Sequence, residues 1–220
     1  SKIKEAINNS DIVINLIGIL FENRKQKFAN MHSDLPGIIA KYCSETEVKK
    51  FIHVSAIGAN ADSNSIYQQS KFNGEQNAFN NFKNTVIIRP SVVCGVEDNF
   101  TNLFAKLSVL PIIPVVKKNY KFQPILVNDV ATAIVKAIEI KKNEGKIYEI
   151  GGPKVISFSD MVKSILSTIG KKRLVVNLPM PIARIQASLL GLMPKPLLTK
   201  DQCEILNEAD NIVSNNHLTL

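Results

Sequence analysis

Short apolar runs alternate with longer segments of mixed polarity along most of the chain. Residues 12–17 are apolar on both faces of an extended backbone apart from one Asn, which is typical of a strand buried in a parallel sheet. Segments of helical character separate such runs, and this alternation predicts a parallel sheet covered by helices. The expected strands are 12–17, 51–55, 85–89 and 146–150, and the expected helices are 3–8, 33–44, 65–82 and 127–140.

The pattern changes near residue 157, after which helices dominate. Ser157 is placed as the N-cap of a helix that Gly170 ends. Residues 103–116 are also apolar, but Pro111 and Pro114 interrupt them, so we expect a helix that runs into a buried loop. The sequence therefore predicts an α/β domain followed by a small, mostly helical C-terminal lobe.

An apolar face also follows Pro179-Met180-Pro181. Ile182, Ile185, Leu189 and Leu190 recur at helical spacing, which predicts one apolar side of a helix. Our first interpretation is a helix whose apolar side packs on the core. The alternative is a helix that faces a membrane surface or a partner, so peripheral membrane proximity through residues 179–198 stays open.

Composition excludes several classes of function. With 45% hydrophobic and 21% charged residues, and no apolar run of about 20 residues, neither a membrane-spanning helix nor a signal peptide is predicted. The net charge of +8 comes from lysines spread along the chain without interleaved aromatic residues, so we expect no nucleic-acid partner. The three cysteines and three histidines match neither a disulfide framework nor metal-ligand spacing, so we expect a reducing compartment and no metal site.

Candidate chemistry lies in Ser55, Tyr67 and Lys71. Tyr67 and Lys71 are four positions apart on one helix face, where an ammonium group can lower the pKa of the phenol and let it exchange a proton near neutral pH. Ser55 ends its strand, where open α/β sheets place their sites, and its hydroxyl can hold a substrate oxygen. The three residues predict a hydride-transfer site, against the alternative of a surface Tyr and Lys beside a loop Ser.

Several motifs resemble the extended and atypical short-chain dehydrogenase/reductases, and one branch in particular. VSA at 54–56, YQQSK at 67–71 and GE at 74–75 resemble the superfamily. The branch is the Rossmann-fold accessory subunit family of respiratory complex I, related to the epimerases and dehydratases. It is resembled through RPSVVCG at 89–95, QP at 123–124, YEIGGP at 148–153, LTKDQ at 198–202 and DNIV at 210–213.

The resemblance implies a doubly wound, Rossmann-like parallel sheet that binds NAD(P)H. In this branch the dinucleotide is a structural element that supports assembly, so turnover of a free substrate is not implied. The resemblance gives catalytic positions to Ser55, Tyr67 and Lys71, and cofactor-binding positions to Leu16, Gly18, Tyr67, Lys71, Pro90, Ser91, Val92 and Val93. It implies complex I subunits as partners and a location at the cytoplasmic face of a bacterial inner membrane. Cys94 departs from the aromatic residue usual before the glycine of this motif.

One expected feature is missing from these 220 residues. Folds of this kind begin with a strand, a Gly-x-x-Gly-x-x-Gly turn and a helix that receives the pyrophosphate, and the sequence contains no such turn. The chain begins where the family has the helix before its fourth strand, so we expect an N-terminally truncated fold without its first three strands. Residues 12–17 then become an edge strand, and NAD(P)H binding by this chain is expected to be weak or absent.

These expectations define the domains and leave three hypotheses. Residues 1–155 are expected to form the incomplete dinucleotide-binding domain, with part of a substrate lobe inserted after about residue 98, and residues 156–220 the helical lobe. The leading hypothesis is an accessory or assembly protein of complex I. The alternatives are an NAD(P)-dependent reductase, epimerase or dehydratase of the same superfamily, and a truncated fragment without independent function.

Overall fold

The computed structural model describes residues 2–190 and 196–214, which divide into two compact units. Unit 1 takes its residues from 1–90, 128–150 and 213–220, and unit 2 from 91–127 and 151–212. This division differs from the expected boundary at residue 155. Residues 91–127 belong with the later segment because Phe104, Ile113 and Tyr120 share a buried apolar cluster with Phe158 and Met161.

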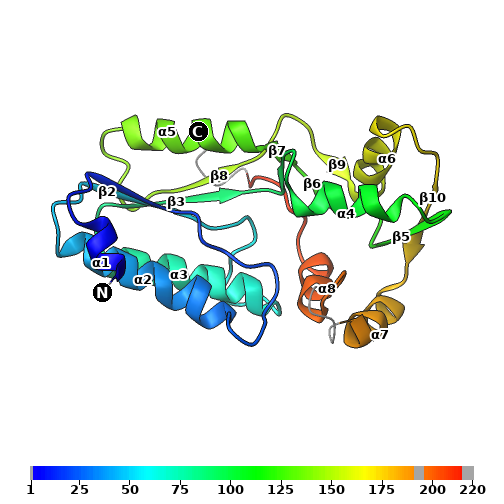
Figure 1. Ribbon diagram of the computed structural model, residues 1–220, viewed down its shortest axis with the longest axis horizontal. Helices are drawn as coiled ribbons and strands as arrows, with labels where there is room; N and C mark the ends of the chain where they lie inside the picture. The colour runs from blue at the N-terminus through cyan, green and yellow to red at the C-terminus, as the bar shows by residue number, and fades with distance from the viewer. Residues whose placement is uncertain (1, 191–195, 215–220) are drawn as a thin grey trace. The chain divides into compact units, whose positions relative to one another are not determined.

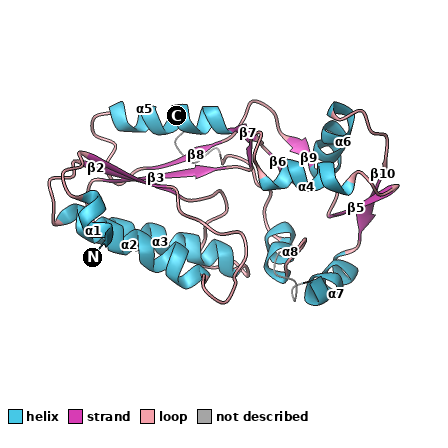
Figure 2. Ribbon diagram, viewed as in Figure 1, coloured by secondary structure: helices cyan, strands magenta, loops and turns pink. Residues whose placement is uncertain are grey.

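Unit 1 alternates strands and helices as the apolar pattern predicts. Its elements are α1 (Lys2–Ile7), β1 (Ile12–Asn15), a π-helical turn (Ala29–Asp34), α2 (Leu35–Ser44), β2 (Lys50–Val54), α3 (Ile66–Asn81), β3 (Thr85–Pro90), α5 (Val127–Glu139, whose first residue falls in unit 2) and β8 (Ile147–Ile150). The four strands pair in parallel in the order β1-β2-β3-β8. Helices α2 and α3 lie on one side of this sheet and α5 on the other, which is the doubly wound arrangement (Figures 1 and 2).

Alternation along β2 decides which side chains meet which layer. Phe51 belongs to a buried cluster with residues of α2 and α3, and the His53 ring stacks against it at a centroid distance of 6.3 Å. Lys50 points to the opposite side, where its ammonium donates to the carbonyls of Ala137 and Ile140 at the end of α5, at 2.9 and 2.8 Å. A cation at a helix C-terminus satisfies carbonyls that have no partner within the helix.

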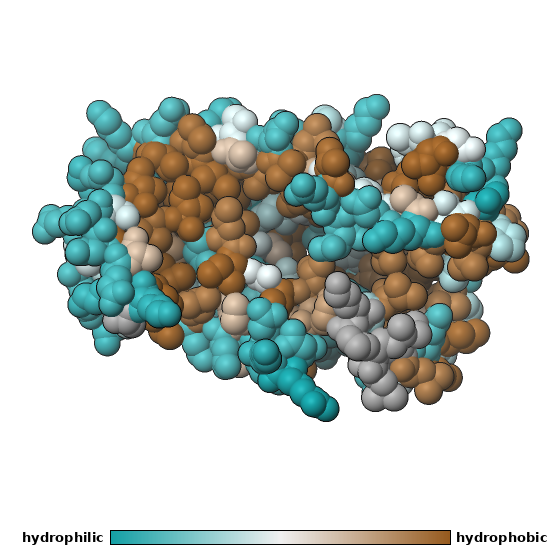
Figure 3. All heavy atoms as spheres, viewed as in Figure 1, coloured by the Kyte–Doolittle hydropathy of each residue, from teal (hydrophilic) through white to brown (hydrophobic). Residues whose placement is uncertain are grey.

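Strand β1 forms one edge of the unit 1 sheet. It pairs with β2 alone, as the sequence led us to expect for residues 12–17, although the strand itself ends at Asn15. Ile14 and Leu16 are exposed. Figure 3 shows apolar side chains gathered on the face of unit 1 between the positions of α1 and α5 in Figure 1.

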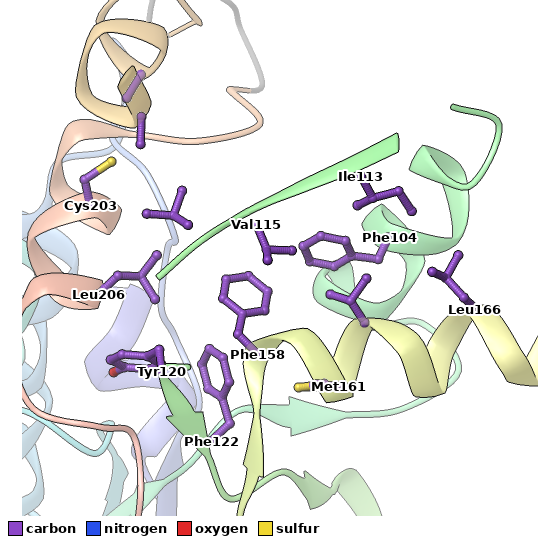
Figure 4. Packing of buried hydrophobic residues seen from close by; sticks show 14 residues of the cluster. Phe104, Ile113, Val115, Tyr120, Phe122, Phe158, Met161, Leu166, Cys203 and Leu206 are labelled. Atoms are coloured by element: carbon purple, nitrogen blue, oxygen red, sulfur yellow. The ribbon is translucent and has the colours of Figure 1, made fainter. Parts of the chain in front are cut away.

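Unit 2 is built from short strands and helices around an aromatic core. Its elements are β4 (Val93–Cys94), α4 (Asn99–Leu107), β5 (Ile112–Val116), β6 (Lys121–Phe122), β7 (Ile125–Leu126), β9 (Ile156–Ser157), α6 (Phe158–Thr168), β10 (Leu174–Leu178), α7 (Met180–Leu190) and α8 (Lys200–Asn207). The rings of Phe122 and Phe158 meet edge to face at 5.3 Å. Figure 4 shows this packing, to which β5, α6 and α8 contribute further side chains.

Two expectations for unit 2 are wrong. Residues 112–116 form a strand, β5, instead of a buried loop. Pro114 is tolerated in this strand because β5 pairs with β10 alone, so only one edge of β5 takes part in backbone pairing. The second error concerns α7, which packs on the core through Ala183 and Ala187. Ile182, Ile185 and Leu189 of its larger apolar side are exposed, while the side chain of Leu190 lies outside the described residues.

No helix within residues 2–190 and 196–214 has the length and apolar character that a membrane crossing requires.

Candidate functional site

Strand β2 and helix α3 bring Ser55, Tyr67 and Lys71 to one end of the unit 1 sheet. Ser55 follows β2 directly, and its amide donates to the carbonyl of Ile88 at 2.7 Å, which extends the pairing with β3. The Ser65 hydroxyl caps α3 by accepting from the Gln68 amide at 3.2 Å, so that the helix begins just before Tyr67.

Lys71 carries a buried cation at this end of the sheet. Only 4% of the residue is exposed, and its ammonium donates to the carbonyl of Val54 at 3.4 Å. The ammonium lies 6.0 Å from the centroid of the Tyr67 ring. Burial lowers the pKa of Lys71 to about 8, against a smaller opposite effect of Glu75.

Gly18 places backbone directly beside this ammonium. A Cβ atom built on Gly18 would stand 3.4 Å from the Lys71 nitrogen and 3.7 Å from Nε2 of His32. Leu16, two residues earlier, is 67% exposed. The loop of residues 16–20 therefore passes beside Lys71, and Gly18, one of the predicted cofactor residues, lies at this site.

Two polar atoms near β2 have no hydrogen-bond partner in the described part of the chain. They are the Ser55 hydroxyl and Nε2 of His53, both fully buried. The side-chain oxygen of Asn15 accepts from the Ile17 amide at 3.1 Å. The side-chain NH2 group of Asn15 therefore faces Nδ1 of His53 at 3.1 Å and donates to it. His53 therefore carries its proton on Nε2. Buried polar groups without partners are costly in a fold, which makes them candidates for contact with a ligand or an ordered water.

His32 occupies the π-helical turn and contacts both α3 and the loop of residues 16–20. Its Nε2 accepts from the Ile19 amide at 2.9 Å, and its Nδ1 lies 3.1 Å from the Ser70 hydroxyl. The Ser70 hydroxyl donates to the Tyr67 carbonyl at 2.7 Å, so it accepts the proton of Nδ1. Both nitrogens have partners in the neutral ring, and burial, assisted by the Lys71 charge, lowers the pKa of His32 to about 3.

Glu75, one helical turn after Lys71, belongs to a buried ionic group. Two hydrogen bonds, of 2.9 and 2.6 Å, join its carboxylate to the Arg89 guanidinium, which lies 3.5 Å from Glu149. Glu149 in turn accepts from the Ser214 amide at 2.9 Å. These side chains fix α3, β3 and β8 to one another.

The remaining cofactor positions are divided between the units. Pro90 is the buried last residue of β3 in unit 1, whereas Ser91, Val92 and Val93 belong to unit 2. Within unit 2 the Ser91 hydroxyl donates to the side-chain oxygen of Asn211 at 2.6 Å, and the Val92 amide donates to the same oxygen at 3.1 Å. The DNIV motif thus acts in part as a structural clamp on this segment.

Sequence reasoning missed His32, His53 and the role of Asn15. An isolated histidine carries no spacing signal. The contact between Asn15 and His53 depends on β1 lying beside β2, and those of His32 depend on the π-helical turn meeting α3 and the loop of residues 16–20. The available signal for Asn15 was a polar residue inside an apolar strand. In residues 2–190 and 196–214, no three His, Cys, Asp or Glu side chains gather as metal ligands.

Relatives of this chain include subunits of a respiratory enzyme. The mouse (Mus musculus) NADH dehydrogenase (ubiquinone) 1 alpha subcomplex subunit 9, a mitochondrial protein, is 34% identical over 211 residues, which cover 94% of this chain and 56% of that protein. The NADH-ubiquinone oxidoreductase 40 kDa subunit of Neurospora crassa is 29% identical over 203 residues, 92% of this chain and 54% of that one. The chain thus spans about half the length of these curated relatives.

Solved structures share the fold. A dTDP-4-dehydrorhamnose reductase from Bacillus anthracis, in complex with NADP, has a TM-score of 0.68 at 19% identity over 81% of this chain and 70% of that chain. A UDP-glucuronic acid 4-epimerase from Bacillus cereus, in complex with NAD, has a TM-score of 0.68 at 20% identity over 81% and 66%. These likenesses confirm the doubly wound, Rossmann-like fold.

The family assignment follows from a match over more than half of the sequence. The family described as the RmlD substrate binding domain matches residues 58–191. This range includes Tyr67 and Lys71 and much of unit 2. The chain belongs to the RmlD substrate-binding-domain family.

Proposed function

We propose that this chain is an NAD(P)H-binding accessory or assembly protein of NADH:ubiquinone oxidoreductase, respiratory complex I. The observation that carries the proposal is the buried Lys71 ammonium, which meets a carbonyl at 3.4 Å and no carboxylate within hydrogen-bond distance among the described residues. A cation held in this way is ready for hydroxyl or phosphate oxygens of a ligand. The similarity to complex I subunits supports the choice of partner.

The residues of unit 1 fit one end of a dinucleotide. Lys71 would bind ribose hydroxyls, Tyr67 would contact the nicotinamide ribose, and the Gly18 backbone leaves the space that a side chain would fill. The orphaned Ser55 hydroxyl supports a polar ligand group beside them. When bound, NAD(P)H supplies a hydride donor, but an accessory role needs only its binding and the order that it imposes on the loop of residues 16–20.

We further propose that this polypeptide alone binds NAD(P)H weakly or not at all. Its sequence has no glycine-rich turn for the pyrophosphate, which is normally held at a helix N-terminus. Only the nicotinamide end of the cofactor is then supported by the residues that we describe in unit 1.

Co-purification tests the accessory role. The chain would carry an affinity tag in its own organism, and the eluate would be assayed for NADH:ubiquinone oxidoreductase activity and subunits. We expect both, in equal amount for the wild type and for Tyr67→Phe, because the phenolic proton is not needed for assembly. Recovery of the tagged chain without complex I subunits would refute this role.

A second candidate function is catalysis as an NAD(P)-dependent reductase, epimerase or dehydratase. It is favoured by one observation, the common placement of Ser55, Tyr67 and Lys71 at the end of β2. Turnover of a nucleotide sugar or a small carbonyl compound that Tyr67→Phe abolishes would establish it, because the phenol is the proton donor in such a reaction. Absence of turnover in an intact wild-type complex would exclude it for the substrates tested.

Location is part of the same proposal. We propose that the protein lies at the cytoplasmic face of a bacterial inner membrane, beside complex I, with residues 179–190 and 196–198 towards the membrane; residues 191–195 of the predicted segment lie outside the described residues. The support for this orientation is the exposed apolar side of α7, where Ile185 is 64% exposed. Flotation with anionic vesicles should be reduced by Ile185→Glu and unaffected by Ser188→Glu, and equal flotation of both variants would contradict the orientation.

A further inference from the structure

The π-helical turn Ala29–Asp34 presents a buried histidine to the candidate site. The His32 ring stacks on Phe28 at a centroid distance of 5.2 Å and meets the Tyr67 ring edge-on, also at 5.2 Å. Helix α3 approaches this turn closely because residue 74 is glycine, since a Cβ there would overlap the His32 carbonyl oxygen. Asn77 secures the approach by donating to the Ser33 carbonyl at 2.9 Å. Turns of this type inside helices are frequent at functional sites.

We propose that His32 is a positioning residue that fixes the loop of residues 16–20 at a set distance from helix α3. The inference deepens the proposed function, because this loop carries Leu16 and Gly18 of the predicted nicotinamide side. It is independent of whether the site performs catalysis or only holds the dinucleotide.

The two hydrogen bonds of His32 give the ring a fixed orientation. Nδ1 donates to the Ser70 hydroxyl, which is itself committed to the Tyr67 carbonyl, and Nε2 accepts from the Ile19 amide. The imidazole thus acts as a rigid spacer between the backbone of the loop and the turn of α3 that separates Tyr67 from Lys71. Its aromatic neighbours prevent the ring from rotating away from either partner.

The loop depends on such anchors because its side chains do not hold it. Leu16, Ile17 and Leu20 are 67%, 44% and 54% exposed, so burial of apolar surface contributes little to its position. Asn15 fixes the start of the loop through the Ile17 amide, and His32 fixes its middle through Ile19. Without the second anchor, Gly18 would lose its set position beside the Lys71 ammonium.

Two substitutions separate the two bonds of the ring. In His32→Gln the side-chain oxygen reaches as far as Nε2 and can accept from the Ile19 amide. In His32→Asn the amide can replace Nδ1 towards Ser70 but is too short to reach Ile19. Ser33→Ala is the matched control, since it removes the neighbouring hydrogen bond to the Ser70 carbonyl and leaves the loop anchor untouched.

Hydrogen exchange of the Ile19 amide, followed by NMR on the full chain, gives the first readout, and the shift of the same amide on titration with NADPH gives the second. We expect His32→Asn to accelerate exchange at Ile19 on the order of tenfold, the equivalent of one hydrogen bond, and to weaken any NADPH affinity by a similar factor. His32→Gln should restore both values towards the wild type, and Ser33→Ala should change neither.

The outcomes separate this inference from the proposed function. Equal exchange at Ile19 in His32→Asn and His32→Gln, or unchanged exchange in His32→Asn, would overturn the positioning role. Faster exchange in His32→Asn and its reversal in His32→Gln, with no NADPH response in any variant including the wild type, would support the positioning role and show that this chain alone does not bind the dinucleotide. Faster exchange with a parallel loss of NADPH affinity supports both.

Discussion

Two neighbouring turns of helix α3 each carry a buried charged side chain, and only one of these side chains forms an ion pair. Glu75 is fully buried and forms two hydrogen bonds with Arg89, whose charge also faces Glu149. Lys71, one turn earlier, is almost as deeply buried, but its ammonium meets a single carbonyl at 3.4 Å. Both residues occupy the same helix in the same unit, so the difference lies in what each faces.

The contrast distinguishes a charge that holds the fold together from one that the fold keeps available. A buried ion pair loses its hydration but recovers much of that cost from its partners, whereas a buried cation without an anion does not. The two histidines beside Lys71 add no second positive charge, because His32 and His53 are both neutral there. We infer that Lys71 is retained for a ligand and Glu75 for stability.

The largest expected effect on stability comes from removing Arg89, the cation of the paired group. Arg89→Met would leave Glu75 and Glu149 buried without a cation, which should lower the free energy of unfolding by about 3–5 kcal/mol. Urea denaturation checks this value. Lys49→Met, which breaks the fully exposed pair with Asp11, is the control and should have no measurable effect. A loss no larger in Arg89→Met than in the control would remove the structural role of the group.

Removing the unpaired charge of Lys71 should raise the free energy of unfolding instead of lowering it. Because the pKa of Lys71 is lowered from 10.5 to about 8, the unfolded chain binds its proton more tightly, and the wild type should gain stability as the pH rises from 8 to 10.5. The shift corresponds to roughly 3 kcal/mol. Lys71→Met should be more stable than the wild type at pH 7, with the difference shrinking towards pH 10.5. A destabilised Lys71→Met at pH 7 would contradict the unpaired state.

A smaller effect concerns the two neutral histidines beside Lys71. The pKa values of His32 and His53 are lowered from 6.5 to about 3, chiefly by burial, so each resists a proton that the unfolded chain accepts. Stability should therefore fall as the pH drops through 6.5, by about 1.2 kcal/mol per histidine between pH 7 and pH 5.5. His53→Gln should lose that share of the pH dependence when its unfolding free energies at pH 7 and 5.5 are compared with the wild type. An unaltered pH dependence would mean that His53 is not held neutral.

Much of unit 1 could be predicted from sequence because its signals are local. The apolar runs gave β1, β2, β3 and β8, and Ser157 in unit 2 caps α6 as expected, with its hydroxyl accepting from the Asp160 amide. The positions of Ser55 after a strand and of Tyr67 and Lys71 on one helix were predicted correctly because strand ends and helical spacing are visible in a sequence, while their role as a site stays a prediction. The fold class and the family resemblance are likewise confirmed by the relatives.

The failures share a different physical origin. Strand β5 forms by pairing with β10, which is distant in the sequence, and Pro111 and Pro114 predicted a loop instead. Helix α7 exposes its larger apolar residues because the side that packs on the core carries the small side chains of Ala183 and Ala187. The π-helical turn and the bonds of His32 arise from the close contact that Gly74 permits, which is a property of two elements together and not of either alone.

The central claim is that Lys71 is an unpaired cation held for a dinucleotide. NMR observation of its ε-methylene group, assigned by comparison with Lys71→Met, measures its pKa and its response to NADPH in one experiment. We predict a pKa near 8 in the protein alone and a progressive shift of the signal with NADPH, with a dissociation constant on the order of a millimolar for this chain. An ordinary pKa of about 10.4 would contradict the unpaired state of Lys71 and with it the claim.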